Sequence, residues 1–368
     1  MKIVVLGGYG NFGARICRAL AGDEQIDLVV AGRSLVKATA LAQTLGAQAA
    51  VLDGADTRLS EALRDCGADL VIHTAGPFQG QDYHVAWSAA RAGCHYIDLA
   101  DGRRFVCDFS SRLNDLFKSA QRSGISGAST VPALSSAVVQ EALSQFSQLE
   151  SVDICIAPAQ RAPRGVATLE GVLSYCGAPI QVWRDGRWQA LHGWAEPTPV
   201  RFERLKARRG ALCDIPDLEL FPLRLAGVQT VMFRAALEVG LTQWAFALLA
   251  SLRRAGLLSA PERLAGFLHR CGSWVDGLGT PDGGMVVRLQ GRDLNGRPLG
   301  KAWEITAPHH HGPEIPCMAA ILLARRLARG EVLPTGAMPC MGLLELDEFA
   351  PEFDRWGMHT SWMQEHVA

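Results

Sequence analysis

The sequence predicts an α/β protein in which a doubly wound parallel sheet is followed by a second, α+β domain with a mixed or antiparallel sheet. Three observations predict this class. An apolar strand runs directly into a glycine-rich turn and a helix at the amino terminus, strand and helix patterns then alternate over about 130 residues, and hairpin sequences follow. Because single cores stop growing near ~250 residues, a chain of 368 residues is expected to form two domains.

The first strand, IVVL at 3–6, is a continuous apolar run typical of a buried parallel strand. GGYGNFG follows, in which Gly8, Gly10 and Gly13 form G-x-G-x-x-G before a helical pattern. Such glycines permit a tight turn, close approach to a pyrophosphate, and close packing of helix on strand, while the helix end offers N–H groups. We interpret the loop as a dinucleotide site, with a purely structural turn as the alternative. The expected contacts are Gly7, Gly8, Gly10, Asn11, Phe12 and Gly13.

The second strand, LVVA at 28–31, ends in the loop Gly32-Arg33-Ser34. NAD-selective sites usually place a carboxylate here for the ribose 2′-hydroxyl, whereas an arginine suits a 2′-phosphate. The Arg33 guanidinium can engage two phosphate oxygens, and Ser34 can bind the phosphate and cap the next helix. We therefore predict NADP(H) rather than NAD(H), with a solvated surface arginine as the alternative.

Four further strands complete the first domain, and ligands of such sheets bind beyond the carboxyl ends of the strands. AAVLD ends at Asp53, which we expect beside the adenine. DLVIHTAGPF, HYIDLADG and GISGAST contain the other three strands. We assign residues 1–132 to a Rossmann-type domain. The segment expected under the pyrophosphate and nicotinamide is Thr74, Ala75, Gly76 and Pro77.

The rest of the chain no longer shows the alternating strand and helix pattern. Two hairpin sequences, IQVWRDGRWQAL and MVVRLQGRDLNGRPLGKAWEIT, turn at Asp185-Gly186 and Asn295-Gly296. We assign residues 133–312 to an α+β domain for substrate binding and dimerisation. The helical pattern PCMAAILLARRLARG follows, and residues 313–368 are expected to pack back on the first domain.

Composition excludes several classes of partner and site. Lys+Arg is 36 against Asp+Glu 37, and no basic tract suggests nucleic-acid binding. The ten cysteines form no CxxC pair, which argues against a zinc knuckle or a disulfide scaffold. A strand that starts right after Lys2 leaves no room for a signal peptide, so we expect a cytoplasmic protein.

One uncharged stretch, VGLTQWAFALLASL at 239–252, was tested as a membrane segment. It is shorter than the roughly 20 residues of a membrane span. We predict a buried or subunit-interface helix, which fits a homodimer. A helix on a membrane surface is the alternative.

With these motifs in place, the chain resembles the saccharopine dehydrogenase-like oxidoreductases. The matching segments are GGYGNFG, VAGRS, TAGPF and GCHYIDLADG. HHHGPEIPCMAA and GAMPCMGLLEL resemble uncharacterised bacterial members. The resemblance implies nicotinamide-dependent hydride transfer to or from a C=N/C–N or C=C bond of a small or medium metabolite, without fixing that small-molecule substrate. The alternatives are an NADPH-binding sensor or scaffold without turnover, and a membrane-surface-associated reductase of a lipid-like substrate.

Hydride transfer also needs a group that moves a proton, in a pocket that we expect between the domains. Asp98, at the end of the fifth strand, is one candidate; capping of the next helix is its alternative role. His310 and His311 are the others, because histidine titrates near neutrality and the following helix end favours a substrate carboxylate. We expect no metal, since adjacent histidines lack the i, i+4 spacing of a helical zinc motif.

Overall fold

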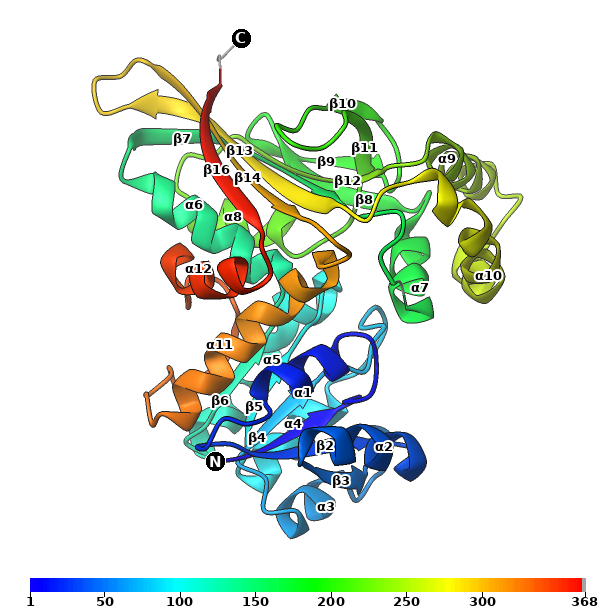
Figure 1. Cartoon of the computed structure of the whole chain (residues 1–368). Coiled ribbons are helices and arrows are strands. Elements are labelled where there is room, and N and C mark those ends of the chain that lie inside the picture. Colours follow the sequence, from blue (N-terminus) through cyan, green and yellow to red (C-terminus); the bar gives the residue numbers. More distant parts are fainter. Residues whose placement is uncertain (164, 366–368) are drawn as a thin grey trace. The chain divides into compact units, whose positions relative to one another are not determined.

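The computed structural model describes residues 1–163 and 165–365, with the backbone alone at Ser273. The chain forms two compact units, here called unit 1 (1–134 and 314–344) and unit 2 (135–313 and 345–368) (Figure 1). The expectation that all of 313–368 packs on the first domain is wrong for 345–365, which belong to unit 2. Residues 366–368 of that segment lie outside the described residues.

The sheet of unit 1 is parallel and has seven strands in the order β15-β6-β5-β4-β1-β2-β3, as the predicted fold class requires. Its strands are β1 (Lys2–Leu6), β2 (Asp27–Gly32), β3 (Gln48–Val51), β4 (Leu70–His73), β5 (His95–Asp98), β6 (Ser123–Ser126) and β15 (Gly336–Pro339). The order reverses direction between β1 and β4, so the loops after these two strands diverge at a topological switch point. The sequence predicted six of the strands and missed β15, whose GAMP sequence contains two poor strand formers.

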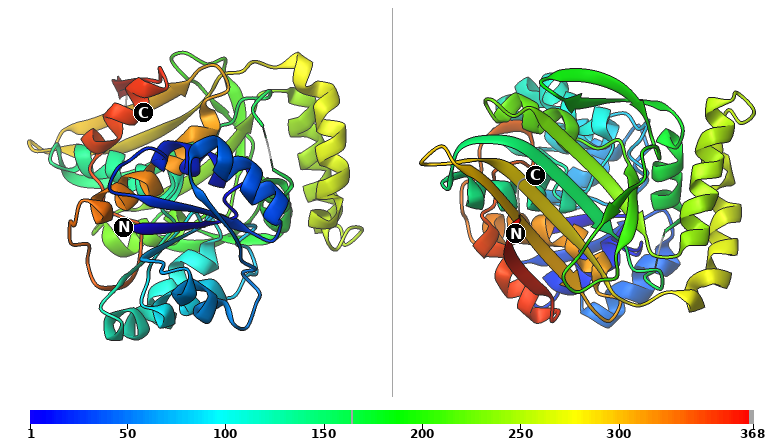
Figure 2. Two further views of the ribbon diagram at one scale, coloured as in Figure 1. Left: turned by 60° about the horizontal axis from the view of Figure 1, so that its bottom comes forward. Right: turned by 90° about the horizontal axis from the view of Figure 1, so that it is seen from above.

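Helices lie on both faces of this sheet (Figure 2). They are α1 (Gly13–Leu20), α2 (Leu35–Leu45), α3 (Leu59–Asp65), α4 (His84–Ala92), α5 (Arg103–Ser119), the turn η1 (Thr130–Leu134) and α11 (Ile315–Ala328). The short turn η4 (Gly312–Glu314) contains the point where the chain passes from unit 2 to unit 1. Helix α11 begins with Pro316 in its first turn and ends before Gly330, as the sequence predicts. It packs on α1, where the Arg325 side chain donates to the Ala19 carbonyl at 3.0 Å.

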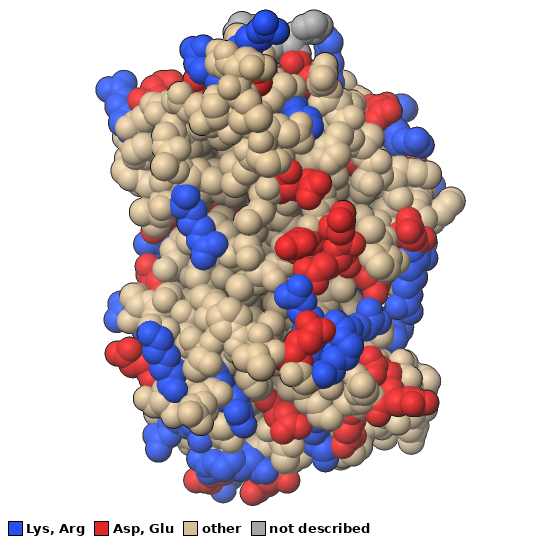
Figure 3. Space-filling model, turned by 90° about the vertical axis from the view of Figure 1, so that its left-hand side faces the viewer, with Lys and Arg blue, Asp and Glu red and all other residues tan. Residues whose placement is uncertain are grey.

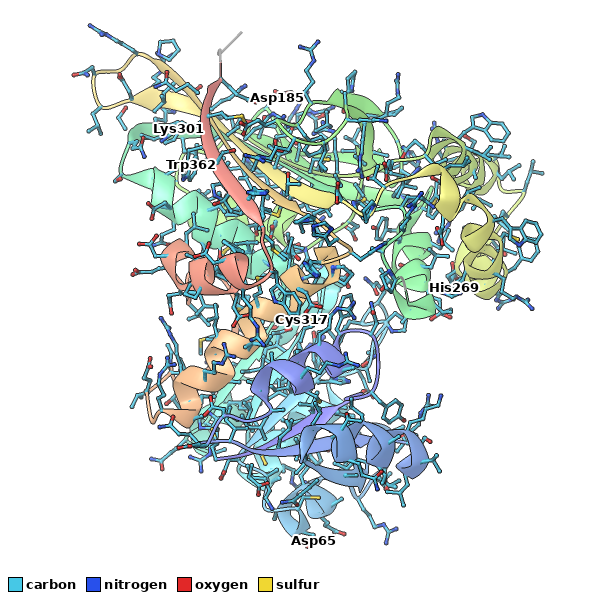
Figure 4. The ribbon with its side chains drawn as sticks, in the orientation of Figure 1. Asp65, Asp185, His269, Lys301, Cys317 and Trp362 are labelled. Atoms are coloured by element: carbon cyan, nitrogen blue, oxygen red, sulfur yellow. The ribbon has the colours of Figure 1, made fainter. Side chains whose placement is uncertain are left out.

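Unit 2 is built on a mixed sheet, which confirms the predicted α+β class. Its strands are β7 (Phe146–Ala157), β8 (Pro179–Arg184), β9 (Arg187–His192), β10 (Thr198–Val200), β11 (Arg208–Leu212), β12 (Thr230–Leu237), β13 (Gly283–Asp293), β14 (Pro298–Ala307) and β16 (His359–Glu365). Strand β7 runs parallel to β12 and antiparallel to β13. Both predicted hairpins form, β8–β9 and β13–β14. On the neighbouring strands β14 and β16, Lys301 lies over the Trp362 ring (Figure 4).

The helices of unit 2 include one that departs from expectation. They are α6 (Ser135–Leu143), α7 (Val166–Tyr175), α8 (Asp217–Arg224), α9 (Gly240–Arg254), η2 (Pro261–Leu264), α10 (Ala265–Val275), η3 (Asp276–Leu278) and α12 (Leu346–Arg355). Helix α9 buries only Gln243 and Ala250. Leu241, Trp244 and Leu248, at i, i+3 and i+7, are exposed on one stripe. Burial of this helix within the chain is therefore wrong, and a subunit or membrane contact stays a prediction.

The charge distribution on the surface and the lengths of the helices were both compared with the expectations from composition. Acidic and basic side chains are interspersed on the face shown in Figure 3. Among the described residues, no helix is both long enough and apolar enough to cross a membrane.

Candidate nucleotide-binding site

The turn after β1 is shaped by three glycines that the protein itself needs. The amides of Gly7 and Gly8 both donate to the Ala31 carbonyl on β2 at 2.9 Å, and Gly7 has a φ of 82°. A Cβ on Gly13 would collide with the Gly7 carbonyl oxygen and lie 2.7 Å from the Thr74 hydroxyl oxygen. These glycines let β1, β2 and α1 approach closely, so the predicted turn and packing roles fall on them.

Gly10 differs from its neighbours. It is exposed, its φ lies outside the left-handed region, and a Cβ there would meet only the Gly7 carbonyl oxygen, at 3.0 Å. Helix α1 starts after Phe12 without a side-chain cap, and the Ala14 amide donates to the Gly10 carbonyl at 3.0 Å. Open space over a glycine beside an uncapped helix end fits a pyrophosphate, and nothing in the protein's own packing explains it.

Asn11, inside the same loop, is held by an ion-paired arginine. Arg15 Nη1 donates to the Asn11 carbonyl at 2.7 Å and to its Oδ1 at 2.9 Å. Arg15 Nε lies 2.8 Å from Glu314 Oε1, and both side chains are largely buried. Glu314 is also the N-cap residue of α11, so a carboxylate of the protein already stands at this helix end. The expected binding of a substrate carboxylate there gains no support.

The loop after β2 contains the predicted cation and a residue that sequence reasoning missed. Arg33 is exposed, and Ser34 Oγ accepts the Lys37 amide at 3.4 Å as the predicted cap of α2. The Ser34 amide donates to Tyr9 Oη at 2.9 Å, and the Tyr9 ring covers Gly32. Tyr9 belongs to the glycine motif, and a glycine at the end of a strand was the signal for a ring packed against it.

The ends of β3 and β4 complete this edge of the sheet. Asp53 is exposed, and its Oδ1 accepts the Ala55 amide at 3.1 Å. Thr74 donates through its hydroxyl to the Leu6 carbonyl at 3.0 Å, and a Cβ on Gly7 would lie 2.8 Å from that hydroxyl. The Gly76–Pro77 bond is cis, and Gln81 Nε2 donates to the carbonyls of Ala75 and Pro77. The loops after β1 and β4 are thus in contact, which leaves Thr74 a positioning role for the glycine turn.

Asp98 is fully buried and binds backbone. Its Oδ1 accepts the Ala100 amide at 2.9 Å, the Gly127 amide at 2.8 Å and the Ser126 hydroxyl at 3.0 Å. Burial raises the pKa of this carboxyl to about 6, opposed by these hydrogen bonds. It does not cap α5, whose N-cap is Gly102 without a side-chain bond. Asp98 therefore ties the carboxyl ends of β5 and β6 together.

The buried pair His73 and Tyr96 lies on the neighbouring strands β4 and β5. Tyr96 Oη is 3.0 Å from His73 Nδ1, and both residues are buried. Burial lowers the pKa of His73 to about 4, so this imidazole is neutral at physiological pH. His73 is a packed core histidine.

The histidine loop, residues 309–311, lies in unit 2. His309 and His310 adopt left-handed backbones with φ of 55° and 66°, and both are exposed. The His310 amide donates to the Pro281 carbonyl at 3.0 Å. His311 Nδ1 is 2.9 Å from the Trp356 carbonyl oxygen, and the two rings meet edge-on. Because a carbonyl only accepts, His311 Nδ1 bears the hydrogen, and its Nε2 is the atom that can take up a proton.

Metal ligation has no support in this geometry. Within residues 1–163 and 165–365, no group of three or more His, Cys, Asp or Glu side chains could hold a metal ion.

The first domain matches a described protein family, and the whole chain matches solved structures. Residues 3–129 match the family described as the saccharopine dehydrogenase NADP binding domain. A saccharopine dehydrogenase (L-Glu forming) from Saccharomyces cerevisiae superposes with a TM-score of 0.71 at 14% identity, over 99% of this chain and 100% of that one. A homospermidine synthase from Legionella pneumophila, solved with NAD, gives a TM-score of 0.63 at 10% identity, over 99% and 91% of the two chains.

The fold and the glycine loop define a nicotinamide-dinucleotide-binding protein of the dehydrogenase type. More closely, residues 3–129 match the saccharopine dehydrogenase NADP binding domain, and the two units share the fold of the solved saccharopine dehydrogenase and homospermidine synthase.

Proposed function

We propose that this protein is an NADP(H)-dependent oxidoreductase that transfers a hydride to or from a C=N/C–N or C=C bond of a small or medium metabolite. The single observation that supports it most is the contrast at the β1 turn: Gly10 is open where Gly7, Gly8 and Gly13 are filled by the protein. Apart from the Gly7 carbonyl oxygen at 3.0 Å, the space beside Gly10 is open, and we assign it to the pyrophosphate.

The cofactor would be held by the loops at the carboxyl ends of the strands of unit 1. Gly8 to Gly13 would hold the pyrophosphate, Arg33 and Ser34 the 2′-phosphate, and Asp53 would lie by the adenine. Residues 74–77 would lie under the nicotinamide. When bound, the cofactor supplies or accepts the hydride, and the protein supplies orientation and the proton.

For the proton we favour the histidine loop over Asp98. His311 has its tautomer set by the Trp356 carbonyl, which leaves Nε2 available, and His310 is exposed. Asp98 Oδ1 already accepts three hydrogen bonds. A carboxyl that is fully buried in the protein is a poor proton carrier compared with an accessible imidazole.

A second candidate function is supported by the exposed stripe of Leu241, Trp244 and Leu248 on α9. Such a stripe suits either a homodimer or a membrane-surface-associated reductase of a lipid-like substrate. Sedimentation distinguishes these two possibilities. A protein that is dimeric in buffer and does not bind anionic vesicles supports the homodimer. A monomer that sediments with the vesicles supports the membrane-surface-associated reductase.

The test of the proposed function is a fluorescence titration of NADPH and NADH against wild type and Arg33→Ala. We expect NADPH to bind more tightly, and loss of the Arg33 contact to cost about 1.5 to 3 kcal/mol, roughly ten- to a hundredfold in affinity. Arg18→Ala, which removes an exposed arginine from α1, is the matched control and should change neither affinity. Equal affinity of wild type for the two cofactors would refute the NADP(H) assignment.

Turnover is the second part of the test. Imines, amino acids and enones should be screened for consumption of NADPH, or for its formation from NADP. Tight NADPH binding with no turnover across these classes would instead favour the sensor or scaffold alternative.

A further inference from the structure

We propose that Tyr9 determines the cofactor specificity of this site, its hydroxyl donating a hydrogen bond to the 2′-phosphate of NADP(H). The inference rests on the proposed function and deepens it. Tyr9 lies in the glycine loop, yet its side chain reaches the loop after β2, where the 2′-substituent of the ribose is expected.

The position of the ring is built into the backbone of β2. A Cβ on Gly32 would lie 2.6 Å from Tyr9 Cε1 and 2.8 Å from Tyr9 Oη. Any other residue at 32 would push the ring away, although the φ of Gly32 does not itself demand glycine. The absence of a side chain at 32 therefore places the phenol across the end of the strand, next to Arg33.

The hydrogen bonds around the hydroxyl give it a direction. The Ser34 amide donates to Tyr9 Oη at 2.9 Å, which occupies one lone pair of the oxygen. The hydroxyl hydrogen is then free to donate, and none of the described residues accepts it. Arg33, which precedes Ser34 in the chain, is exposed, so the loop presents donors and a positive charge.

Such a group favours an anion over a neutral hydroxyl. A 2′-phosphate offers acceptor oxygens to both the phenol and the guanidinium, and charge-assisted hydrogen bonds are the stronger kind. A 2′-hydroxyl has no charge for these donors to meet. The nearest acid expected at the adenosine, Asp53, has its Oδ1 engaged by the Ala55 amide.

The test compares wild type with Tyr9→Phe, which keeps the ring over Gly32 and removes only the oxygen. The probes are adenosine 2′,5′-bisphosphate and 5′-ADP, followed by NADPH and NADH, titrated by calorimetry. We expect affinity for the two 2′-phosphorylated ligands to fall roughly tenfold or more, the scale of a hydrogen bond to a charged group. Affinity for 5′-ADP and NADH should change less than about twofold.

Two further variants keep the result interpretable. Tyr83→Phe removes another phenol oxygen of unit 1, one that donates to the Phe105 carbonyl on α5 at 3.1 Å, and should leave all four affinities unchanged. Gly32→Ala should displace the ring and lower the preference for 2′-phosphorylated ligands. In the Tyr9→Phe background, the same change should no longer alter that preference.

Three outcomes would overturn the proposal. An equal loss of affinity for all four ligands would make the Tyr9 hydroxyl merely structural. Tighter NADPH binding by Tyr9→Phe would mean that the hydroxyl occupies the place of the phosphate. An unchanged preference would exclude any role. Failure of wild type to bind any of the four ligands would instead refute the dinucleotide site itself, so the two failures are distinguishable.

Discussion

The glycine loop of unit 1 and the histidine loop of unit 2 are both short sequence motifs, but the structure treats them differently. In the glycine loop, a Cβ on Gly7, Gly8 or Gly13 would collide with neighbouring atoms, whereas a Cβ on Gly10 would meet only the Gly7 carbonyl oxygen. In the histidine loop the backbone is tied down by Pro281 and Asp282, while His309 and His310 remain exposed. A motif defined by backbone space can be interpreted locally. A motif defined by side-chain chemistry depends on what lies around it.

The largest effects are expected for substitutions of the glycines in the glycine loop. Gly10→Val should abolish detectable NADPH binding while the protein stays folded, because the new methyl groups would occupy the open space of the pyrophosphate. Gly13→Ala should instead destabilise the fold by about 1 to 3 kcal/mol or more, since its Cβ would collide with the Gly7 carbonyl oxygen. Thermal unfolding and titration of both variants measure the two effects separately.

One result would contradict the prediction for Gly10→Val. A folded Gly10→Val protein that binds NADPH as wild type does would remove the dinucleotide assignment of this loop. Gly13→Ala then serves as the positive control for a glycine whose role is packing.

The same contrast explains what the sequence could and could not predict. The β1 turn, the Ser34 cap and the Asp185-Gly186 and Asn295-Gly296 hairpins depend on local backbone rules, and the structure has them. Strand β15 was missed because its place in the sheet comes from pairing with β6, far away in sequence. The local sequence pattern does not indicate which distant strand a segment pairs with.

Side chains were harder to assign for the same physical reason. Tyr9 was overlooked because its partner, the Ser34 amide, lies 25 residues away. Asp98 is expected near the chemistry from its place at a strand end, and β5 does end at this residue. Its carboxylate, however, is used by Ala100, Ser126 and Gly127, a fact that only the folded arrangement reveals.

The second prediction tests whether the histidine loop supplies the proton. Replacing His310 and His311 with glutamine keeps hydrogen bonding and removes titration. We expect kcat/KM to fall by roughly a hundredfold or more, and the pH profile of kcat/KM to change. NADPH affinity should be nearly unchanged, because we assign the phosphates of the cofactor to loops of unit 1.

The matched control for this variant is His309→Gln in the same loop. His309 is equally exposed and shares the left-handed backbone of His310, so its replacement should leave rate and profile as in wild type. Full activity of the double variant, with the wild-type pH profile, would show that these histidines do not move the proton.

The smallest effect on turnover is expected for substitution of Asp98 by asparagine. This variant tests whether Asp98, in unit 1, has a structural role. Asp98→Asn retains an oxygen for the Ala100 and Gly127 amides, so we expect NADPH affinity and kcat/KM to stay within a few-fold of wild type. Asp98→Ala would leave those buried amides unpaired, at about 1 to 3 kcal/mol each. Only the alanine variant should therefore show a marked loss of stability.

The pH dependence of stability tests the burial of the Asp98 carboxyl, and turnover tests whether this carboxyl is catalytic. The folded protein holds the Asp98 proton up to about pH 6, whereas an unfolded chain releases it near its ordinary value of 3.8. Stability from this group is thus present below about pH 4 and lost as the pH rises through 6, by up to about 3 kcal/mol. The free energy of unfolding of Asp98→Asn lacks this loss, so the variant should gain on wild type between pH 4 and 7 in urea titrations. If Asp98→Asn instead loses turnover at unchanged NADPH affinity, the proton comes from unit 1, and the assignment of backbone roles to unit 1 and side-chain chemistry to unit 2 is wrong.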